Sequence, residues 1–394
     1  MIRPGPEFPV VLATYSTKPR GGVVHTLELA AALQRIGEPV HLVSLGDPEE
    51  GFFRPTPVPA TIFPAPLPAP TLEERVAAAV DALAAGLEGM ATVPCIVHTQ
   101  DCIAARAACR VRDAGAPFVV VRTVHHVDDF TTPALVECQR LAISQPDRLL
   151  VVSRYWKHRL QADFGVSAEV VTNGVDAERY AGPPPLDPAA LRSRAGLDGR
   201  FTFLTVGGIE PRKGSAVLIE ALGQLCRGPQ PPPALVVVGG HSFQDHSAYR
   251  RRVLNRAEEL GLELGRDITI VGTVSDDEVI SWYHAADAFV FPSVNEGWGL
   301  TVLEAQAAGL PVIASDIAVF REYLDDEAAM MVPSEDPVAL EDAMSRLTQD
   351  GELRQRLSSA GAAVARRFSW EACARQHQAI YRAVRPGQED AGVA

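Results

Sequence analysis

Two glutamates flank a glycine-rich turn in the stretch SVNEGWGLTVLEAQAAGLPVIASD, which runs from Ser293 to Asp316. Eight residues of helix would separate Glu296 from Glu304 by about 12 Å. The two carboxyl groups of a retaining glycosidase lie only roughly 5–5.5 Å apart. We therefore expect the two acids to hold different hydroxyl groups rather than to act as an acid–base pair.

The turn between the acids predicts a site for a phosphate or pyrophosphate. A strand is expected to end at Pro292 and a helix to begin near Leu300, so that the free N–H groups of the first helical turn face a ligand. Glycine allows the ligand to approach the backbone closely. The residues expected to bind this phosphate-bearing ligand are Gly297, Trp298, Gly299, Leu300 and Thr301. On this interpretation Glu304 reaches a ribose and Glu296 a sugar. The alternatives are a favourable helix-dipole contact for Glu304 and solvated surface for Glu296.

The elements that must position these residues alternate as strand and helix, twice over. Such an alternation predicts right-handed crossovers and mainly parallel sheets, an α/β fold with two doubly wound domains. Ligands of such sheets lie outside the carboxyl ends of the strands. We expect a first domain over 1–180, a Pro- and Gly-rich linker over 181–199, a second domain over 200–368, and a last helix and tail over 369–394 that crosses back to the first domain.

Composition narrows the function classes. The 394 residues carry a formal net charge of −13, which argues against nucleic acid as a partner. The six cysteines show no metal-binding spacing and indicate thiols in a reducing compartment. No apolar run is long enough to span a bilayer, and the first apolar segment indicates a strand rather than a signal peptide. We expect a cytoplasmic protein without a transmembrane segment.

The stretch ADAFVFPSVNEGWGLTVLEAQAAGLPVIAS resembles the signature of retaining glycosyltransferase family four (group 1) along its whole length. The resemblance covers nearly all of the chain. It implies the GT-B architecture, two Rossmann-like domains facing across a cleft. It also implies that Glu296 contacts the transferred sugar and Glu304 the nucleotide ribose. The strings TYSTKPRGGVVH and TVHHVDDF look closer still to a bacterial subfamily encoded beside a nitrilase-like gene.

Further residues of the second domain agree with this resemblance. In GGIEPRKGS, Lys213 matches a family lysine, whereas Gly208 stands where the family usually has arginine. Arg212 is a candidate to supply that missing cation. Lys213 and Arg212 would neutralise a departing nucleoside diphosphate. The family also implies donor contacts for Gly207, Gly239 and Gly272, which end three strands.

A glycine pair and some of the histidines of the first domain are further candidate site residues. Gly21-Gly22 resembles the family loop that packs against the donor diphosphate; a dehydrogenase would need G-x-G-x-x-G, which is absent here. The family's T-x-H motif implies a place near the reacting carbon for His125. His126 and Asp128 then lie on the acceptor side. His25 is expected either there or in the core. The spacing of His125, His126 and Asp128 also allows a zinc site, which no other cluster supports.

These observations predict transfer of a sugar from a nucleotide diphosphate sugar to a small-molecule or glycoconjugate acceptor, with retention and without a metal or another cofactor. His125, Glu296 and Lys213 are the expected catalytic residues. The alternatives are a nucleotide-sugar epimerase or phosphorylase of similar architecture, and a catalytically silent nucleotide-sugar-binding subunit.

Overall fold

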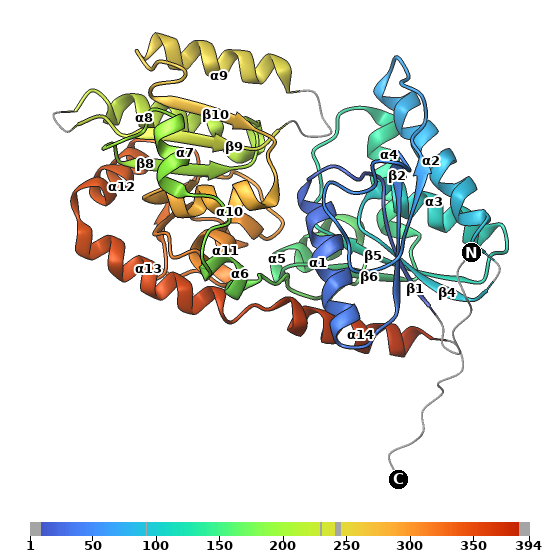
Figure 1. The fold of residues 1–394 in the computed structure, drawn as a ribbon. Coiled ribbons are helices and arrows are strands. Elements are labelled where there is room, and N and C mark those ends of the chain that lie inside the picture. Colours follow the sequence, from blue (N-terminus) through green and yellow to red (C-terminus); the bar gives the residue numbers. More distant parts are fainter. Residues whose placement is uncertain (1–8, 92, 229–230, 241–245, 386–394) are drawn as a thin grey trace. The chain divides into compact units, whose positions relative to one another are not determined.

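The computed structural model describes residues 9–91, 93–228, 231–240 and 246–385, and it divides the chain into two compact units (Figure 1). The first unit comprises residues 1–174 together with 370–394, and the second comprises 175–369. Residues 181–199, expected as a linker, belong to the second unit. Among the described residues, no helix combines the length and apolar character needed to cross a membrane.

A seven-stranded parallel sheet forms the centre of the first unit, in the order β3-β2-β1-β4-β5-β6-β7. The strands are β1 (Val10–Thr14), β2 (Val40–Gly46), β3 (Ala60–Pro64), β4 (Cys95–Thr99), β5 (Phe118–Val124), β6 (Arg148–Val151) and β7 (Glu169–Val170). The helices are α1 (Gly21–Arg35), α2 (Leu72–Glu88), α3 (Cys102–Asp113), α4 (Pro133–Ser144), α5 (Arg154–Phe164) and, from the end of the chain, α14 (Trp370–Val384).

The central strands of this sheet are buried along their whole length. All residues of β1 and β4 are buried, as expected for a parallel sheet covered on both faces. Helix α14 packs against α1, so the end of the chain completes the first unit. Asp101 begins α3, where its carboxylate accepts a hydrogen bond from the Ala104 N–H. The alternation of strands and helices in the sequence predicted this parallel sheet.

The second unit has a six-stranded parallel sheet in the order β10-β9-β8-β11-β12-β13. Its strands are β8 (Thr202–Val206), β9 (Ala234–Val238), β10 (Ile268–Gly272), β11 (Ala288–Phe291), β12 (Val312–Ser315) and β13 (Met330–Val332). Its helices are α6 (Ala177–Ala181), α7 (Pro188–Arg194), α8 (Ser215–Leu225), α9 (Ser247–Glu259), α10 (Asp276–Ala285), α11 (Leu300–Ala307), α12 (Pro337–Gln349) and α13 (Gly351–Ala365), with 3-10 turns η1 (Pro211–Lys213) and η2 (Phe320–Glu322).

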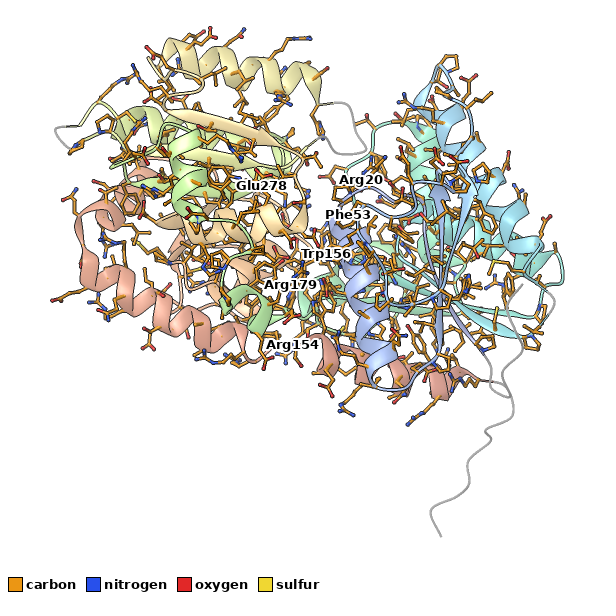
Figure 2. The ribbon with its side chains drawn as sticks, in the orientation of Figure 1. Arg20, Phe53, Arg154, Trp156, Arg179 and Glu278 are labelled. Carbon is orange, nitrogen blue, oxygen red and sulfur yellow. The ribbon has the colours of Figure 1, made fainter. Side chains whose placement is uncertain are left out.

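Ion pairs hold the two short helices that open the second unit. Arg179 on α6 lies 3.4 Å from Asp276, and Arg194 on α7 lies 3.1 Å from Glu278. Figure 2 labels one partner of each pair, Arg179 and Glu278. Both acids are in the first turn of α10, where the helix dipole also favours negative charge. These contacts attach α6 and α7 to the second unit.

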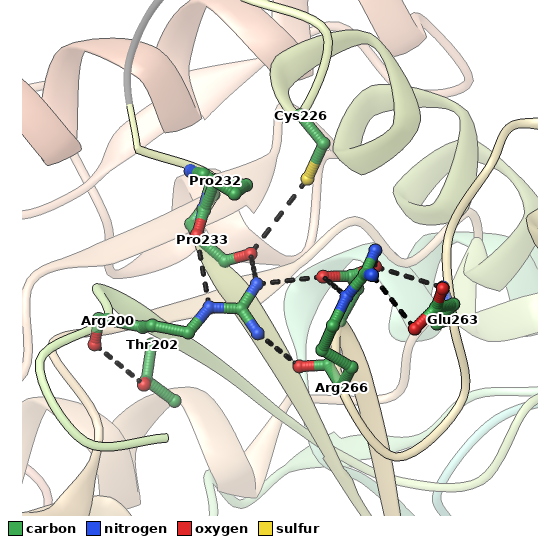
Figure 3. A network of polar contacts seen from close by, with 8 residues as sticks. Arg200, Thr202, Cys226, Pro232, Pro233, Glu263 and Arg266 are labelled. Atoms are coloured by element: carbon green, nitrogen blue, oxygen red, sulfur yellow. Dashed lines mark hydrogen bonds and ion pairs between the residues drawn. The ribbon is translucent and has the colours of Figure 1, made fainter. Parts of the chain in front are cut away.

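A separate polar network fixes the amino ends of β8, β9 and β10 (Figure 3). Arg200 donates to the carbonyl oxygens of Pro232, Pro233 and Arg266, and it lies 2.9 Å from the buried Asp267 carboxylate. The cavity here, lined by residues that include Arg227 and Leu262, lies at the strand ends opposite to those that carry the glutamate site described below. We therefore interpret this network as structural, because it holds the amino ends of the strands together.

Candidate active site

Glu296 is the centre of a charged cluster in the second unit. The Lys213 Nζ lies 2.5 Å and the Arg212 Nη1 2.7 Å from the same carboxylate oxygen, Oε1. Ser293 Oγ donates to that oxygen at 3.2 Å. Glu296 is 6% exposed. Two cations thus converge on one buried carboxylate, so the three groups together carry a net positive charge.

The backbone of two loops brings these residues together. Arg212 and Lys213 lie in η1, which follows β8, and Glu296 lies in the loop after β11. The Val294 N–H donates to the Arg212 carbonyl at 2.8 Å, which joins the loops directly. Gly214 has a φ of 66°, and a Cβ there would lie 1.9 Å from the Pro292 carbonyl oxygen. Only glycine fits this position.

Burial lowers the pKa of Lys213, and the neighbouring Glu296 carboxylate opposes that shift. The Lys213 Nζ also lies 4.4 Å from the centre of the Phe291 ring. At Gly207, a Cβ would lie 3.2 Å from the lysine Cε, so the glycine leaves room for the lysine stem. Lys213 is therefore held in a half-buried environment that an anion would stabilise.

Glycines at the ends of β8 and β9 pack backbone against backbone. A Cβ at Gly208 would lie 2.2 Å from the Gly240 carbonyl oxygen, and one at Gly239 would lie 3.0 Å from the Gly207 carbonyl carbon. The Gly239 N–H donates to the carbonyl of Gly272. The close approach at Gly208 leaves no space for a side chain at that position. Arg212 contacts Glu296, and its replacement of the family arginine stays a prediction.

Helix α11 begins after Gly299, which has a φ of 89° and approaches the Phe320 ring so closely that a Cβ would lie 2.5 Å from it. Among the described residues, no side chain caps this helix, and the N–H groups of Leu300 and Thr301 have no partner within it. The Thr301 hydroxyl is buried and has no hydrogen-bond partner in the part of the chain that the structure describes. Trp298 is buried and stacks on Tyr323 at 4.7 Å between ring centres, so its ring supports the turn from within the core.

Glu304 has different partners from Glu296. Its Oε2 accepts a hydrogen bond from the buried Tyr283 hydroxyl at 2.8 Å. Burial, followed by the Glu304 charge, raises the pKa of Tyr283 well above its usual range. Tyr283 therefore remains a hydrogen-bond donor at neutral pH. The two acids occupy separate environments, one between cations and the other beside a phenol.

In the first unit, Gly21 and Gly22 are the first two residues of α1 rather than a loop before it. A Cβ at Gly22 would come within 3.8 Å of His125 Cδ2 and 3.9 Å of the Gln100 carbonyl oxygen. His125 follows β5, and its Nε2 lies 3.1 Å from Gln100 Oε1. Burial, followed by the charge of Arg122, lowers the pKa of His125 well below 6.5. The imidazole is therefore neutral at pH 7.

His25 lies inside a cluster of aromatic rings. It is 1% exposed, and its ring centre lies 4.7 Å from that of His125, 5.4 Å from that of Trp370 and 6.3 Å from that of His377. Burial lowers its pKa, as do the neighbouring His125 and His377. Of the two expectations for His25, this burial supports the core-facing one.

His126 and Asp128 form a half-buried pair, with 3.3 Å between Nε2 and Oδ1. The Asp128 backbone is fixed at both N–H and C=O by Gln139 of α4. Within the described ranges, no three His, Cys, Asp or Glu side chains are grouped so that they could hold a metal ion.

Sequence reasoning missed Tyr283, Ser293, Gln100, His98 and His377. Ser293 was within the quoted signature, and its position three residues before Glu296 could have suggested the contact. Gln100 lies 25 positions from His125, Tyr283 lies 21 positions from Glu304, and His98 lies 283 positions from Tyr381, so no local pattern reveals these contacts. The contacts of Gln100 with His98 and of His377 with Cys373 are local, because they join residues two and four positions apart.

Two protein families match consecutive parts of the chain. The family described as "Glycosyltransferase Family 4" matches residues 19–179, and that described as "Glycosyl transferases group 1" matches residues 187–364. The chain belongs to the family-four, group-1 glycosyltransferases. This confirms the resemblance derived from the Glu296–Glu304 signature. The narrower link to a subfamily beside a nitrilase-like gene stays a prediction.

Curated relatives of this family include "D-inositol 3-phosphate glycosyltransferase" of Corynebacterium glutamicum, which is 32% identical over 265 residues, covering 64% of this chain and 62% of the relative. The relative of the same name from a Nocardioides species is 34% identical, covering 55% of this chain and 48% of its own length. The chain thus spans about half to three fifths of the length of these relatives.

Solved structures show the fold. A sucrose-phosphate synthase from Thermosynechococcus elongatus superimposes with a TM-score of 0.78 at 23% identity, covering 96% of this chain and 99% of the other. HepE of Anabaena, crystallised with UDP and glucose, gives a TM-score of 0.78 at 18% identity, covering 96% of this chain and 100% of the other. The chain has the GT-B fold.

Proposed function

We propose that this chain transfers a sugar from a nucleoside diphosphate sugar to an acceptor hydroxyl or amine, with retention at the anomeric carbon. The observation that carries the proposal is the convergence of Lys213 and Arg212 on Glu296 Oε1, in the loops that follow β8 and β11. Their net positive charge and the free amides of α11 suit a diphosphate. Glu304, which accepts a hydrogen bond from Tyr283, would then bind the ribose.

The state of Glu296 favours electrostatic catalysis over a covalent intermediate. A carboxylate bonded to a lysine and an arginine is a weak nucleophile and a weak base. In the proposed step, the bond between the anomeric carbon and the phosphate oxygen breaks. The acceptor oxygen bonds to that carbon on the same face, and the leaving phosphate takes the acceptor's proton. Lys213 and Arg212 stabilise the charge that develops on the leaving group.

The donor can be identified first. We expect one of the UDP-, GDP- and ADP-sugars to raise the melting temperature of the chain clearly more than the others, because a ligand that binds only the folded state stabilises it by mass action. UDP-glucose is the first compound to test, since HepE was crystallised with UDP and glucose. The names of the curated relatives make D-inositol 3-phosphate the first acceptor to test, with unphosphorylated inositol as its comparison.

Product analysis then tests the reaction. The proposal requires acceptor-dependent release of the nucleoside diphosphate and an anomeric configuration in the product equal to that of the donor. The rate should be unchanged by EDTA, because lysine, arginine and backbone amides supply the positive charge. Conversion of the donor without an acceptor would indicate an epimerase, and dependence on inorganic phosphate a phosphorylase. Donor binding without any turnover would indicate a silent subunit.

A further inference from the structure

A chain of side-chain hydrogen bonds in the first unit leads from helix α14 to His125. The Tyr381 hydroxyl lies 2.7 Å from His98 Nδ1. His98 Nε2 lies 2.7 Å from the Thr123 hydroxyl and 3.2 Å from Gln100 Nε2. Gln100 Oε1 in turn lies 3.1 Å from His125 Nε2. All of these side chains except His125 are at most 3% exposed, so each depends on the others for hydrogen bonds.

The Gln100 amide gives this network a direction. An amide nitrogen only donates and an amide oxygen only accepts. Since Gln100 Nε2 faces His98 Nε2, the latter must be an acceptor, and the His98 proton lies on Nδ1, where it is donated to the Tyr381 oxygen. Since Gln100 Oε1 faces His125 Nε2, that nitrogen must carry a hydrogen. The two histidines therefore have opposite tautomers.

We propose that Gln100 is a positioning residue that fixes His125 as its Nε2–H tautomer, so that His125 meets the substrate only through the lone pair of Nδ1. The proposal rests on the proposed function and on the place near the reacting carbon that the family's T-x-H motif implies for His125. Within the described part of the chain, His125 Nδ1 has no hydrogen-bond partner. A neutral imidazole with a bare Nδ1 accepts a hydrogen bond from a hydroxyl and cannot donate one to a phosphate oxygen. His125 would therefore recognise a hydroxyl of the sugar or acceptor.

The tautomers can be measured without any substrate. In the full chain labelled with 15N-histidine, long-range proton–nitrogen correlation spectra at pH 7 report which ring nitrogen of each histidine is protonated. Signals are assigned with His98→Asn and His125→Asn. We expect the proton of His98 on Nδ1 and that of His125 on Nε2. A wild-type spectrum with either proton on the other nitrogen would overturn the proposal, even if no variant of Gln100 folds.

The Gln100→Glu variant tests whether Gln100 is the cause. A carboxylate only accepts hydrogen bonds, so the His98 proton should move to Nε2 while His125 keeps its Nε2–H. His41, which is bonded to Thr61 at 2.8 Å outside this network, should not change. The control is Gln378→Met, because Gln378 is a half-buried glutamine of the same unit that bonds to Glu38 instead. A His98 proton that stays on Nδ1 in Gln100→Glu would contradict the proposal.

Kinetics test the consequence for transfer. We expect Gln100→Met to lower kcat about tenfold, a typical loss for a misplaced catalytic contact, with the donor KM nearly unchanged. Gln378→Met should retain the wild-type kcat. Full kcat in Gln100→Met would show that the tautomer is not used and would overturn the positioning role. If the chain transfers no sugar at all, the proposed function fails while the spectra still decide the tautomers.

Discussion

The two units carry polar clusters of opposite character at the carboxyl ends of their central strands. In the second unit the cluster consists of charges, with Lys213 and Arg212 paired to Glu296. In the first unit it consists of neutral rings, among them His25, His98 and His125. Both clusters are largely buried. They differ in the charged groups that lie next to the lysine in one and next to the histidines in the other.

Burial acts on both clusters in the same direction, because it disfavours the protonated form of lysine and histidine alike. For Lys213 the adjacent Glu296 opposes this effect, whereas the histidines face other histidines and Arg122, which add to it. The second unit can therefore hold a cation ready for a diphosphate. The histidine rings of the first unit are neutral donors and acceptors, which suit hydroxyl groups.

The largest expected effect comes from removing the half-buried cation Lys213 of the second unit. Lys213→Met should lower kcat/KM by roughly 100-fold or more, a loss typical of one donor that stabilises developing charge. Release of the nucleoside diphosphate measures this. The control is Lys157→Met, which changes an exposed lysine on α5. Wild-type turnover in Lys213→Met would show that sugar transfer does not need the charge of Lys213.

The neutral cluster should make the first unit sensitive to acid. Burial lowers the pKa of His377 to about 4, and no carboxylate opposes this among the described side chains that its ring contacts, those of Cys373, His25, His98 and Tyr381. The unfolded chain, with a histidine pKa of about 6.5, binds the proton first as pH falls. The stability that this group contributes is therefore complete above about pH 6.5 and is lost down to pH 4, by roughly 3 kcal/mol in all.

Amide exchange in α14 peptides of the full chain, corrected for the intrinsic pH dependence of exchange, should show this loss between pH 7 and pH 5. His377→Gln should reduce the pH dependence, whereas His158→Gln, a change at an exposed position on α5, should not. Equal protection of α14 at pH 7 and pH 5 would show that the lowered pKa of His377 does not make the stability of this helix depend on pH.

The contrast also depends on the backbone that positions the charges. Gly214→Ala should destabilise the second unit by at least about 2 kcal/mol, because the new Cβ meets the Pro292 carbonyl and the φ of 66° is unfavourable for alanine. Gly265→Ala is the matched control, since Gly265 has a φ of 84° but open space around its Cβ position. Denaturant titration should show a clearly larger loss for Gly214→Ala. Equal losses would mean that the close contact with Pro292 does not constrain the loop.

The smallest expected effect concerns the phenol beside Glu304. Tyr283→Phe removes a hydrogen bond of 2.8 Å and should weaken donor binding by about three- to tenfold, in line with the modest net contribution of one ordinary hydrogen bond. Donor titration by calorimetry measures this, with Tyr155→Phe on α5 as the comparison. Unchanged affinity would show that Glu304 does not need Tyr283 to hold its ligand.

The sequence by itself determined the alternation of strands and helices, and with it both parallel sheets. Buried apolar runs such as Val10–Thr14 and caps such as Asp101 are local signals, so they are legible without a structure. The sequence also placed Glu296 and Lys213 in the loops after strands, through the spacing of their signature. Their identification as site residues remained a prediction from resemblance.

Only the tertiary structure decided which side chains meet. Glu296 and Lys213 are 83 positions apart along the chain, and His98 and Tyr381 are 283 apart. Which end of the Gln100 amide faces which histidine depends on the packing of β4, β5 and α14. The periodicity of apolar residues predicts which face of a helix or strand is buried, but it does not predict which buried side chain lies opposite. For that reason the charged cluster was partly foreseen and the histidine network was not.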